Sequence, residues 1–345
     1  MMARMMTSYF RISLAANMDS LPVELVNAIA DELTSCGDIS SFRLTRRSFS
    51  TIGLPLQAQH ISVLDSFESL TRLAAFLELN PFFAQYTTRF TVYHAAWFCS
   101  SDTWEMRPAL ENIYVDEQHR NFITAEAHRH LHADATLIIR ILRLLPRLRM
   151  LTVAPMPSWK MRRHEELSVN PLNQDSAGMT CSRIFPILRV FPLIQQLEVY
   201  GRVDPRELRW NNLEHIRKLH VQSLILSLST QNSMPSFLQR FPGLQELHLG
   251  AAQGMQGKAL FDGLALQDLQ TVKLTNIWIT SERFVALLTQ HPSLHSITME
   301  EATLSTGSWE KLLEITRKCY PHINLVVQNC CLNPYKYRTP RLYSY

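Results

Sequence analysis

The sequence contains little glycine and none of the short motifs that accompany common enzyme chemistries. Gly accounts for 10 of its 345 residues, so few backbone positions could cradle a phosphate group. The G-x-S-x-G turn, the H-E-x-x-H pair and the dinucleotide-binding Gly pattern are all missing from the sequence. We therefore expect no catalytic residues and no cofactor, and the chain is predicted not to be an enzyme.

Disulfide, zinc and membrane signals are lacking as well. The six cysteines have neither the spacing of a disulfide framework nor that of a zinc site, and reduced thiols predict a cytoplasmic or nuclear location. No apolar run reaches the ~18 residues of a membrane-spanning helix, and no secretory signal is recognisable, so no membrane association is expected. The net charge of +4 is small and its Lys and Arg residues are scattered, which argues against a nucleic-acid partner.

Three alternating histidines in the segment AHRHLHAD, His128, His130 and His132, are the strongest metal-binding candidate. On a strand they would share one face, but their neighbours, including Asp134, indicate the approach to a helix, on which they diverge. No Cys or carboxylate set with ligand spacing accompanies them. We therefore predict no metal site.

Residues 18–54 have the pattern of two or three short helices. Pro22 suits a first helical turn, and Asp38 can cap a second helix. A unit of this size cannot bury enough surface to be stable alone, so it requires a partner. Apolar residues recur at every fourth position of its first half, namely Leu21, Leu25, Ile29 and Leu33.

The motif L-P-x-E-L at residues 21–25, followed by D-I-x-x-F-R-L-T-R-R-x-F at residues 38–49, resembles an F-box. Ala30 and Phe49 depart mildly from that pattern, in which a larger residue and Trp are common. The resemblance implies docking on the adaptor subunit of a cullin-RING ubiquitin ligase of the SCF type, with apolar anchors in a groove. An ordinary helical hairpin packed on the next domain is the alternative. The resemblance assigns adaptor binding to Leu21, Pro22, Leu25, Ile29, Leu33, Ile39, Phe42, Leu44 and Phe49.

A second pattern recurs from residue 145 onward: a Pro and then three aliphatic residues at fixed spacing. Four copies contain the Pro: LPRLRMLTV at 145–153, FPLIQQLEV at 191–199, FPGLQELHL at 241–249 and HPSLHSITM at 291–299. Two copies lack it: LEHIRKLHV at 213–221 and LQDLQTVKL at 266–274. The spacing and the aliphatic core resemble leucine-rich repeats of an irregular, fungal-type kind, although the regular Asn or Cys after the strand is missing.

These resemblances imply an α/β chain in which a short helical F-box precedes a curved leucine-rich-repeat solenoid, with one strand and one helix per repeat. The predicted parts are a disordered extension at 1–17, the F-box at 18–54, a linker with degenerate first repeats at 55–140, the solenoid at 141–330 and a tail at 331–345. Residues 154–182, rich in Pro and Asn, are expected to form an inserted loop. That loop either contacts a partner or is a tolerated surface insertion.

Strand residues alternate between two faces, so the residues between the aliphatic positions are predicted to form columns on the concave face. The first column contains Met150, Gln196, Lys218, Glu246, Thr271 and Ser296. The second contains Thr152, Glu198, His220, His248, Lys273 and Thr298, and the third contains Ala154, Tyr200, Gln222, Gly250, Thr275 and Glu300. The predicted substrate-binding residues are Gln196, Glu198, Tyr200, Lys218, His220, Glu246, His248, Lys273, Thr298 and Glu300.

Mixed polar columns suit a protein surface or a peptide better than a polyanion, and a solvated face without a ligand is the alternative. The sequence therefore predicts a substrate-recognition adaptor of an SCF-type ubiquitin ligase that binds an unidentified protein substrate. The alternative is a non-catalytic repeat scaffold that binds proteins without ubiquitin transfer.

Overall fold

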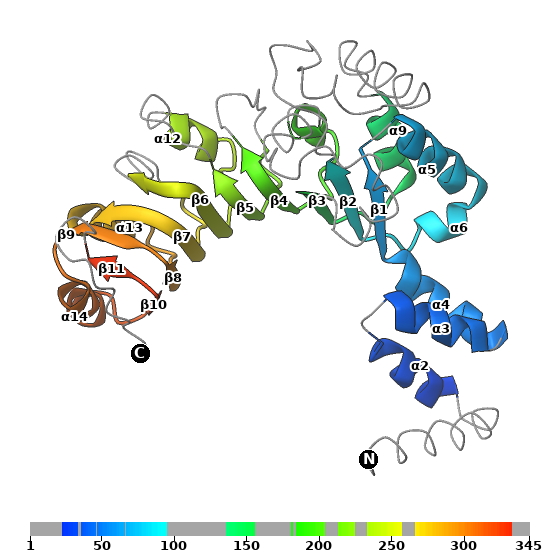
Figure 1. Cartoon of the computed structure of the whole chain (residues 1–345), viewed down its shortest axis with the longest axis horizontal. Coiled ribbons are helices and arrows are strands. Elements are labelled where there is room, and N and C mark those ends of the chain that lie inside the picture. Colours follow the sequence, from blue (N-terminus) through cyan, green and yellow to red (C-terminus); the bar gives the residue numbers. More distant parts are fainter. Residues whose placement is uncertain are drawn as a thin grey trace, which may run out of the picture.

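The computed structural model describes residues 23–33, 36–45, 47–65, 67–94, 136–155, 181, 184–203, 213–224, 233–256 and 266–332. Within these residues the chain is a mixed α/β protein, with a group of helices at one end of a curved parallel sheet (Figure 1). The predicted extension at 1–17 and the histidines at 128, 130 and 132 lie outside the described residues.

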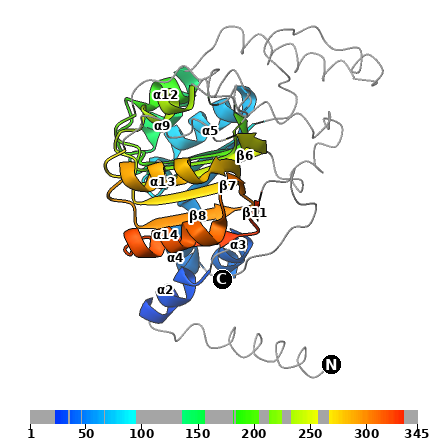
Figure 2. The same cartoon turned by 90° about the vertical axis from the view of Figure 1, so that its left-hand side faces the viewer.

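Three helices form the amino-terminal group: α2 at Val23–Asp31, α3 at Cys36–Thr45 and α4 at Arg47–Ala58. α2 lies farthest from the sheet in both side views (Figures 1 and 2). The aromatic rings of Phe42 and Phe49 stack with centroids 4.8 Å apart, which joins α3 to α4. α4 continues beyond the predicted boundary at residue 54, because Pro55 is accommodated within the helix.

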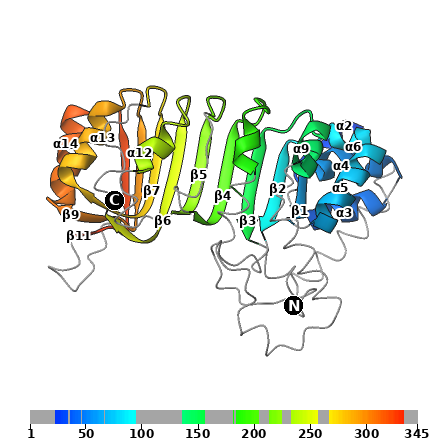
Figure 3. The same cartoon turned by 90° about the horizontal axis from the view of Figure 1, so that it is seen from above.

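The strands follow one another across the sheet in the order in which they occur in the chain (Figure 3). Every pairing among the described strands is parallel, and β9 and β11 extend the sheet beside β7. The strands are β1 His60–Leu64, β2 Arg89–His94, β3 Met150–Pro155, β4 Gln196–Val203, β5 Lys218–Leu224, β6 Glu246–Gln256, β7 Thr271–Thr280, β8 Ser296–Glu300, β9 Thr303–Thr306, β10 Asn324–Gln328 and β11 Cys331–Leu332.

Helices connect several of the strands, and α9, α12 and α13 lie along the outer side of the arc (Figure 1). The helices of this part are α5 Phe67–Leu79, α6 Pro81–Ala84, α9 Thr136–Leu144, α12 Ser233–Leu238, α13 Ser281–Gln290 and α14 Trp309–Cys319. The described residues contain no helix between β4 and β5 or between β6 and β7, where residues 204–212 and 257–265 lie outside the description. The predicted arrangement of one strand and one helix per repeat is therefore seen only in part of the described chain.

The predicted aliphatic positions form a continuous core between the sheet and the outer helices. In β7 and β8 they alternate with half-exposed residues along the strand. α13 contributes Phe284, Leu287 and Leu288 to the same core. Two rows of fully buried strand residues cross the sheet: Leu151, Leu197, Leu219, Leu247, Val272 and Ile297, and Val153, Val199, Val221, Leu249, Leu274 and Met299.

A ladder of backbone hydrogen bonds joins residues at the starts of neighbouring strands. From Thr88 onward, each amide in the ladder donates to the carbonyl of the ladder residue at the neighbouring strand, at N···O distances of 2.8–3.0 Å. Because each turn is bonded to the one before it, the starts of the strands are held level across the sheet. The residues of the ladder are Gln59, Thr88, Arg149, Gln195, Arg217, Gln245, Gln270, His295 and Asn324.

Strands of the sheet fall within three of the predicted segments outside the core of the solenoid. β1 and β2 pair with the later strands and lie in the segment 55–140, for which degenerate first repeats were predicted. Ala154 and Pro155, at the start of the loop predicted at 154–182, belong to β3, and Cys181 near its end is buried in the core. The expected tail at 331–345 begins with β11, which pairs with β9. No helix in the described part of the chain is long and apolar enough to cross a membrane.

Candidate functional site

The face of the sheet opposite the outer helices, here called the inner face, carries the predicted polar columns. Strand pairing places the first column in direct register, from Met150 to Ser296. The second column is likewise continuous from Thr152 to Thr298. The third is continuous only from Gly250 to Glu300, because the register shifts after Val199 in β4 and after Val221 in β5.

Glu198 of β4 lies at the centre of a hydrogen-bond cluster on this face. Its Oε1 accepts a bond from Gln196 Nε2 at 2.9 Å. Its Oε2 accepts from the Tyr200 hydroxyl at 3.2 Å and from the Thr152 hydroxyl at 3.4 Å. Burial raises the pKa of Tyr200, and the neighbouring Glu198 carboxylate raises it further. Tyr200 is therefore protonated at neutral pH and acts as a donor to Glu198.

Two histidines continue this cluster across the next two strands. The Tyr200 and His220 rings meet edge to face with centroids 5.0 Å apart, and the His220 and His248 rings do so at 5.5 Å. Burial lowers the pKa of both histidines, and their proximity lowers that of His220 further. Both imidazoles are therefore neutral at pH 7, where each offers one hydrogen-bond donor and one acceptor.

The lysines of the inner face are paired with carboxylates. Lys218 Nζ lies 2.6 Å from Glu246 Oε1, its direct partner across β5 and β6. Lys273 Nζ lies 2.6 Å from Glu300 Oε2, which belongs to β8. Both pairs are partly exposed, so each contributes ~1 kcal/mol or less to stability. Their main effect is to cancel charge locally.

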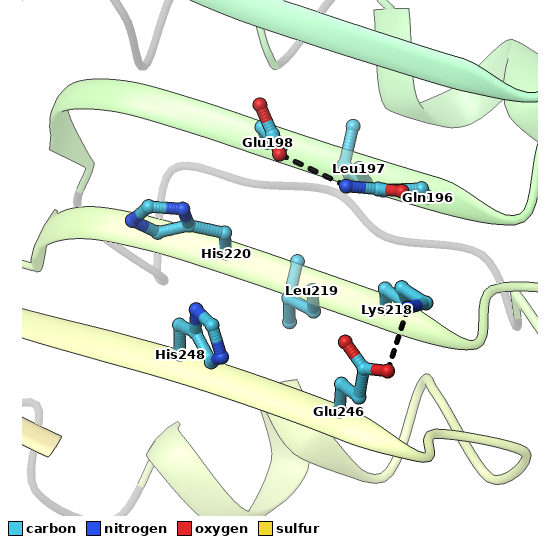
Figure 4. Close-up of a pocket in the computed structure, with 8 residues that line it drawn as sticks. All are labelled: Gln196, Leu197, Glu198, Lys218, Leu219, His220, Glu246 and His248. Carbon is cyan, nitrogen blue, oxygen red and sulfur yellow. Dashed lines mark hydrogen bonds and ion pairs between the residues drawn. The ribbon is translucent and has the colours of Figure 1, made fainter. Parts of the chain in front are cut away.

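A small pocket open to the inner face lies between β4, β5 and β6 (Figure 4). Figure 4 shows Glu198, His220 and His248 on three successive strands, with Leu219 between His220 and Lys218 along β5. The pocket brings together six of the ten predicted substrate-binding residues: Gln196, Glu198, Lys218, His220, Glu246 and His248. Tyr200, Lys273, Thr298 and Glu300 lie on the same face outside its lining.

The sequence-based list of binding residues omits Thr152, although Thr152 belongs to the same column. Its side chain is 8% exposed and its hydroxyl donates to Glu198. Its position in the column was visible in the sequence. The hydrogen bond between Thr152 and Glu198 could not be predicted from the sequence, because it depends on the rotamers of both side chains.

The residues predicted to bind the ligase adaptor divide into exposed and buried groups. Leu25 and Leu44 are 51% and 86% exposed, and Ile29 and Leu33 are half-buried against the helical core. Three further residues of the predicted set are buried within the helical group: Ile39, Phe42 and Phe49. Leu21 and Pro22 lie outside the described residues.

Buried Ile39, Phe42 and Phe49 are not available as groove anchors in this arrangement. Phe42 and Phe49 instead form the small helical core together with Val26 and Ala30. Three short helices have few other apolar side chains with which to pack. Exposed adaptor-binding candidates in the described part are therefore Leu25 and Leu44.

Metal and thiol chemistry have little support in the part of the chain that the structure describes. Within it, no group of three or more His, Cys, Asp or Glu side chains could hold a metal ion. Burial raises the pKa of Cys330 to about 11, so this thiol is protonated at neutral pH and unreactive.

Comparison with known proteins does not assign a family. No family model matches the chain, and no curated protein matches it. Among solved structures it matches a chain of the complex of Rad7 and Elc1 from yeast, with 9% identity and a TM-score of 0.30. That match covers 98% of this chain and 95% of the other. At this level the likeness carries no argument, so the function proposed below depends on the chain's own residues.

Proposed function

We propose that this chain is a non-enzymatic substrate-recognition adaptor of an SCF-type ubiquitin ligase. In this proposal α2–α4 are an F-box that docks on the ligase's adaptor subunit. The parallel sheet is a divergent leucine-rich-repeat solenoid that begins at β1 and binds a protein substrate on its inner face. The adaptor supplies no catalytic group and acts by raising the effective concentration of substrate near the conjugating enzyme.

The presence of two bodies with separate cores is the observation that carries this proposal. Val26, Ala30, Phe42 and Phe49 form one small core, whereas the buried residues of the sheet and its helices form another. A three-helix unit of this size is marginal without a partner, and it exposes Leu25 and Leu44. Apolar helical residues of this kind typically enter a groove on a partner protein.

A non-catalytic repeat scaffold without ubiquitin transfer is the second candidate. The observation that favours it is the burial of Ile39, Phe42 and Phe49, which leaves the helical group fewer exposed anchors than the F-box resemblance implies. A helical group that serves mainly to cover the first strands would have this property. The two candidates share the inner face as a binding surface and differ in whether a cullin is recruited.

Co-purification of the full chain with the ligase's adaptor subunit and cullin tests the proposal. We expect the intact chain to retain both subunits. Leu25→Asp together with Leu44→Asp should weaken adaptor binding by at least ~2 kcal/mol, the usual cost of losing a hot-spot residue. Leu193→Asp is the matched control, because Leu193 is 46% exposed and belongs to the repeats.

The outcomes separate the two candidates. Retention of the adaptor subunit without cullin supports the scaffold, and failure of the intact chain to bind the adaptor contradicts both ligase docking and the F-box assignment. Equal loss of binding in Leu193→Asp would show that the helical leucines have no specific role. Circular dichroism of each variant confirms that the sheet remains folded.

A further inference from the structure

We propose that the pocket around Glu198 binds a basic side chain, Arg or Lys, presented by a segment of the partner protein. This inference rests on the proposed function, because it names the chemistry of the substrate that the inner face recognises.

Among the described residues, Glu198 differs from the inner-face carboxylates Glu246 and Glu300 in having no Lys or Arg partner. Glu246 and Glu300 each lie 2.6 Å from a lysine nitrogen. Glu198 instead accepts bonds from an amide and two hydroxyl groups, all uncharged donors. Among the described residues no Lys or Arg forms an ion pair with it. The negative charge of Glu198 is thus held in position but not neutralised.

The hydrogen-bonding capacity of Glu198 is incomplete as well. An ionised carboxylate offers about four acceptor positions, and Glu198 uses three of them for Gln196, Tyr200 and Thr152. These three donors also fix the orientation of the carboxylate before a partner arrives. An ammonium or guanidinium group would fill the remaining position and form the stronger, charge-assisted kind of hydrogen bond.

The histidines that line the pocket favour a cation over an anion. His220 and His248 make ring contacts with each other, and neither ring forms a hydrogen bond within the described part of the chain. A neutral imidazole has one acceptor nitrogen, so both rings can accept from the further N–H groups of Arg or Lys. An anion would be repelled by Glu198 and would find Lys218 and Lys273 already paired.

The pocket is small, lies between three neighbouring strands and opens onto the inner face. A single long basic side chain that enters from this face would place its charged end beside Glu198. The polar columns on both sides would then contact the flanking residues of the partner.

Peptide selection on the purified full chain, with no ligase subunit present, tests this proposal. Phage displaying random heptapeptides are selected on the immobilised protein, and the winning peptides are synthesised in two forms. One form retains the selected Arg, and the other carries citrulline, which has nearly the same shape but no charge. Fluorescence anisotropy then gives the affinity of each form.

We expect the selected peptides to share a basic residue, and we expect citrulline to weaken binding to the wild-type chain about tenfold or more. In Glu198→Gln the difference between the two forms should shrink to about twofold or less, because the charge that Arg recognises is gone. Glu282→Gln is the control, since Glu282 is an exposed carboxylate on the outer helix α13. This substitution removes the same charge on the side of the sheet opposite the inner face. The wild-type preference for the Arg form over the citrulline form should therefore remain.

Selection of peptides without a basic residue, or of none, overturns the proposal, as does equal binding of the Arg and citrulline forms by the wild-type chain. Circular dichroism would reveal whether Glu198→Gln fails to fold. Even in that case, the comparison of the Arg and citrulline peptides on the wild-type chain tests the proposal. The ligase proposal is tested separately, because co-purification requires the exposed leucines of α2 and α3 and not Glu198. Either proposal can therefore fail while the other stands.

Discussion

The amino-terminal helices and the parallel sheet bury apolar residues in two different ways. The helices close a small core around Val26, Ala30, Phe42 and Phe49. The sheet shares one core that extends without interruption from Ile61 to Cys330. In a stacked sheet each unit covers the apolar surface of its neighbours, so stability is distributed along the chain. The helical group depends on a few contacts within its own small core.

The largest effect is expected from removing a large side chain from the shared core. Phe241 is fully buried and its ring meets Phe237 edge to face, with centroids 5.4 Å apart. Phe241→Ala should lower the free energy of unfolding of the sheet by about 3–5 kcal/mol, measured by urea denaturation. Phe82→Ala is the size-matched control. It is 53% exposed with one aromatic neighbour, and it should cost less than about 1.5 kcal/mol.

The same substitution in the helical group should act locally. Phe49→Ala removes the ring that stacks on Phe42, and the small core has few other contacts to compensate. We expect the amides of α2–α4 to lose protection from hydrogen exchange. The unfolding free energy of the sheet should change by less than about 0.5 kcal/mol. A shift of the sheet's transition as large as that of Phe241→Ala would mean that the two bodies unfold together.

A smaller loss is expected from adding a methyl group at Gly250, where the neighbouring strand leaves no room for a side chain. A Cβ atom added at Gly250 would lie 2.0 Å from the backbone oxygen of Gln222, at the point where the register of β5 and β6 shifts. Gly250→Ala should therefore destabilise the sheet by about 1–3 kcal/mol in urea denaturation. Thr275→Ala, at the position paired with Gly250, removes atoms without adding any and should cost less. A neutral effect of Gly250→Ala would mean that the bulge can widen.

The smallest expected effect is a loss of stability of the sheet at low pH, caused by two histidines of the inner face. Burial is the main cause that lowers the pKa of His220 and His248, whereas unfolded histidine titrates near ~6.5. As pH falls below that value the unfolded chain takes up protons first, so the stability of the sheet decreases until the folded pKa values are reached. Urea denaturation at pH 7.5 and 5.5 should show this loss.

The double variant His220→Gln and His248→Gln provides the check on this pH effect. It should reduce the difference in stability between the two pH values, because glutamine does not titrate. An unchanged difference in the double variant would assign the effect to other histidines. His215 and His291 are the first alternatives, since burial lowers the pKa of both.

The sequence predicted the sheet better than the helical group. The fixed spacing of aliphatic residues predicted that Leu219 and Val221 face the core. It predicted that Lys218 and His220 lie on the opposite, inner face, because strand side chains alternate between faces. Sequence spacing could not reveal which side of α3 faces its neighbours. Phe42 fits a helical stripe equally well as an internal contact or as a groove anchor, and tertiary packing decides between the two.

Two further features depended on contacts that sequence reasoning does not reach. β1 at His60–Leu64 follows α4 with almost no linker and lacks the Pro-containing phrase that identified later strands. The second feature is the charge of Glu198, which has no Lys or Arg partner among the described residues, because the lysines of β5 and β7 pair with Glu246 and Glu300. A list of polar residues contains all these groups without indicating which charge lacks a partner.

The backbone ladder at the start of the strands makes the geometry of the sheet independent of how much chain separates its units. One step joins residue 195 to residue 217, and another joins residue 88 to residue 149 through a bond of similar length. Because the entropy cost of closing a loop rises slowly with its length, long and short connections are tolerated alike. Segments could therefore be inserted after a strand, and new partner-binding loops acquired there, while the inner face keeps its spacing and register.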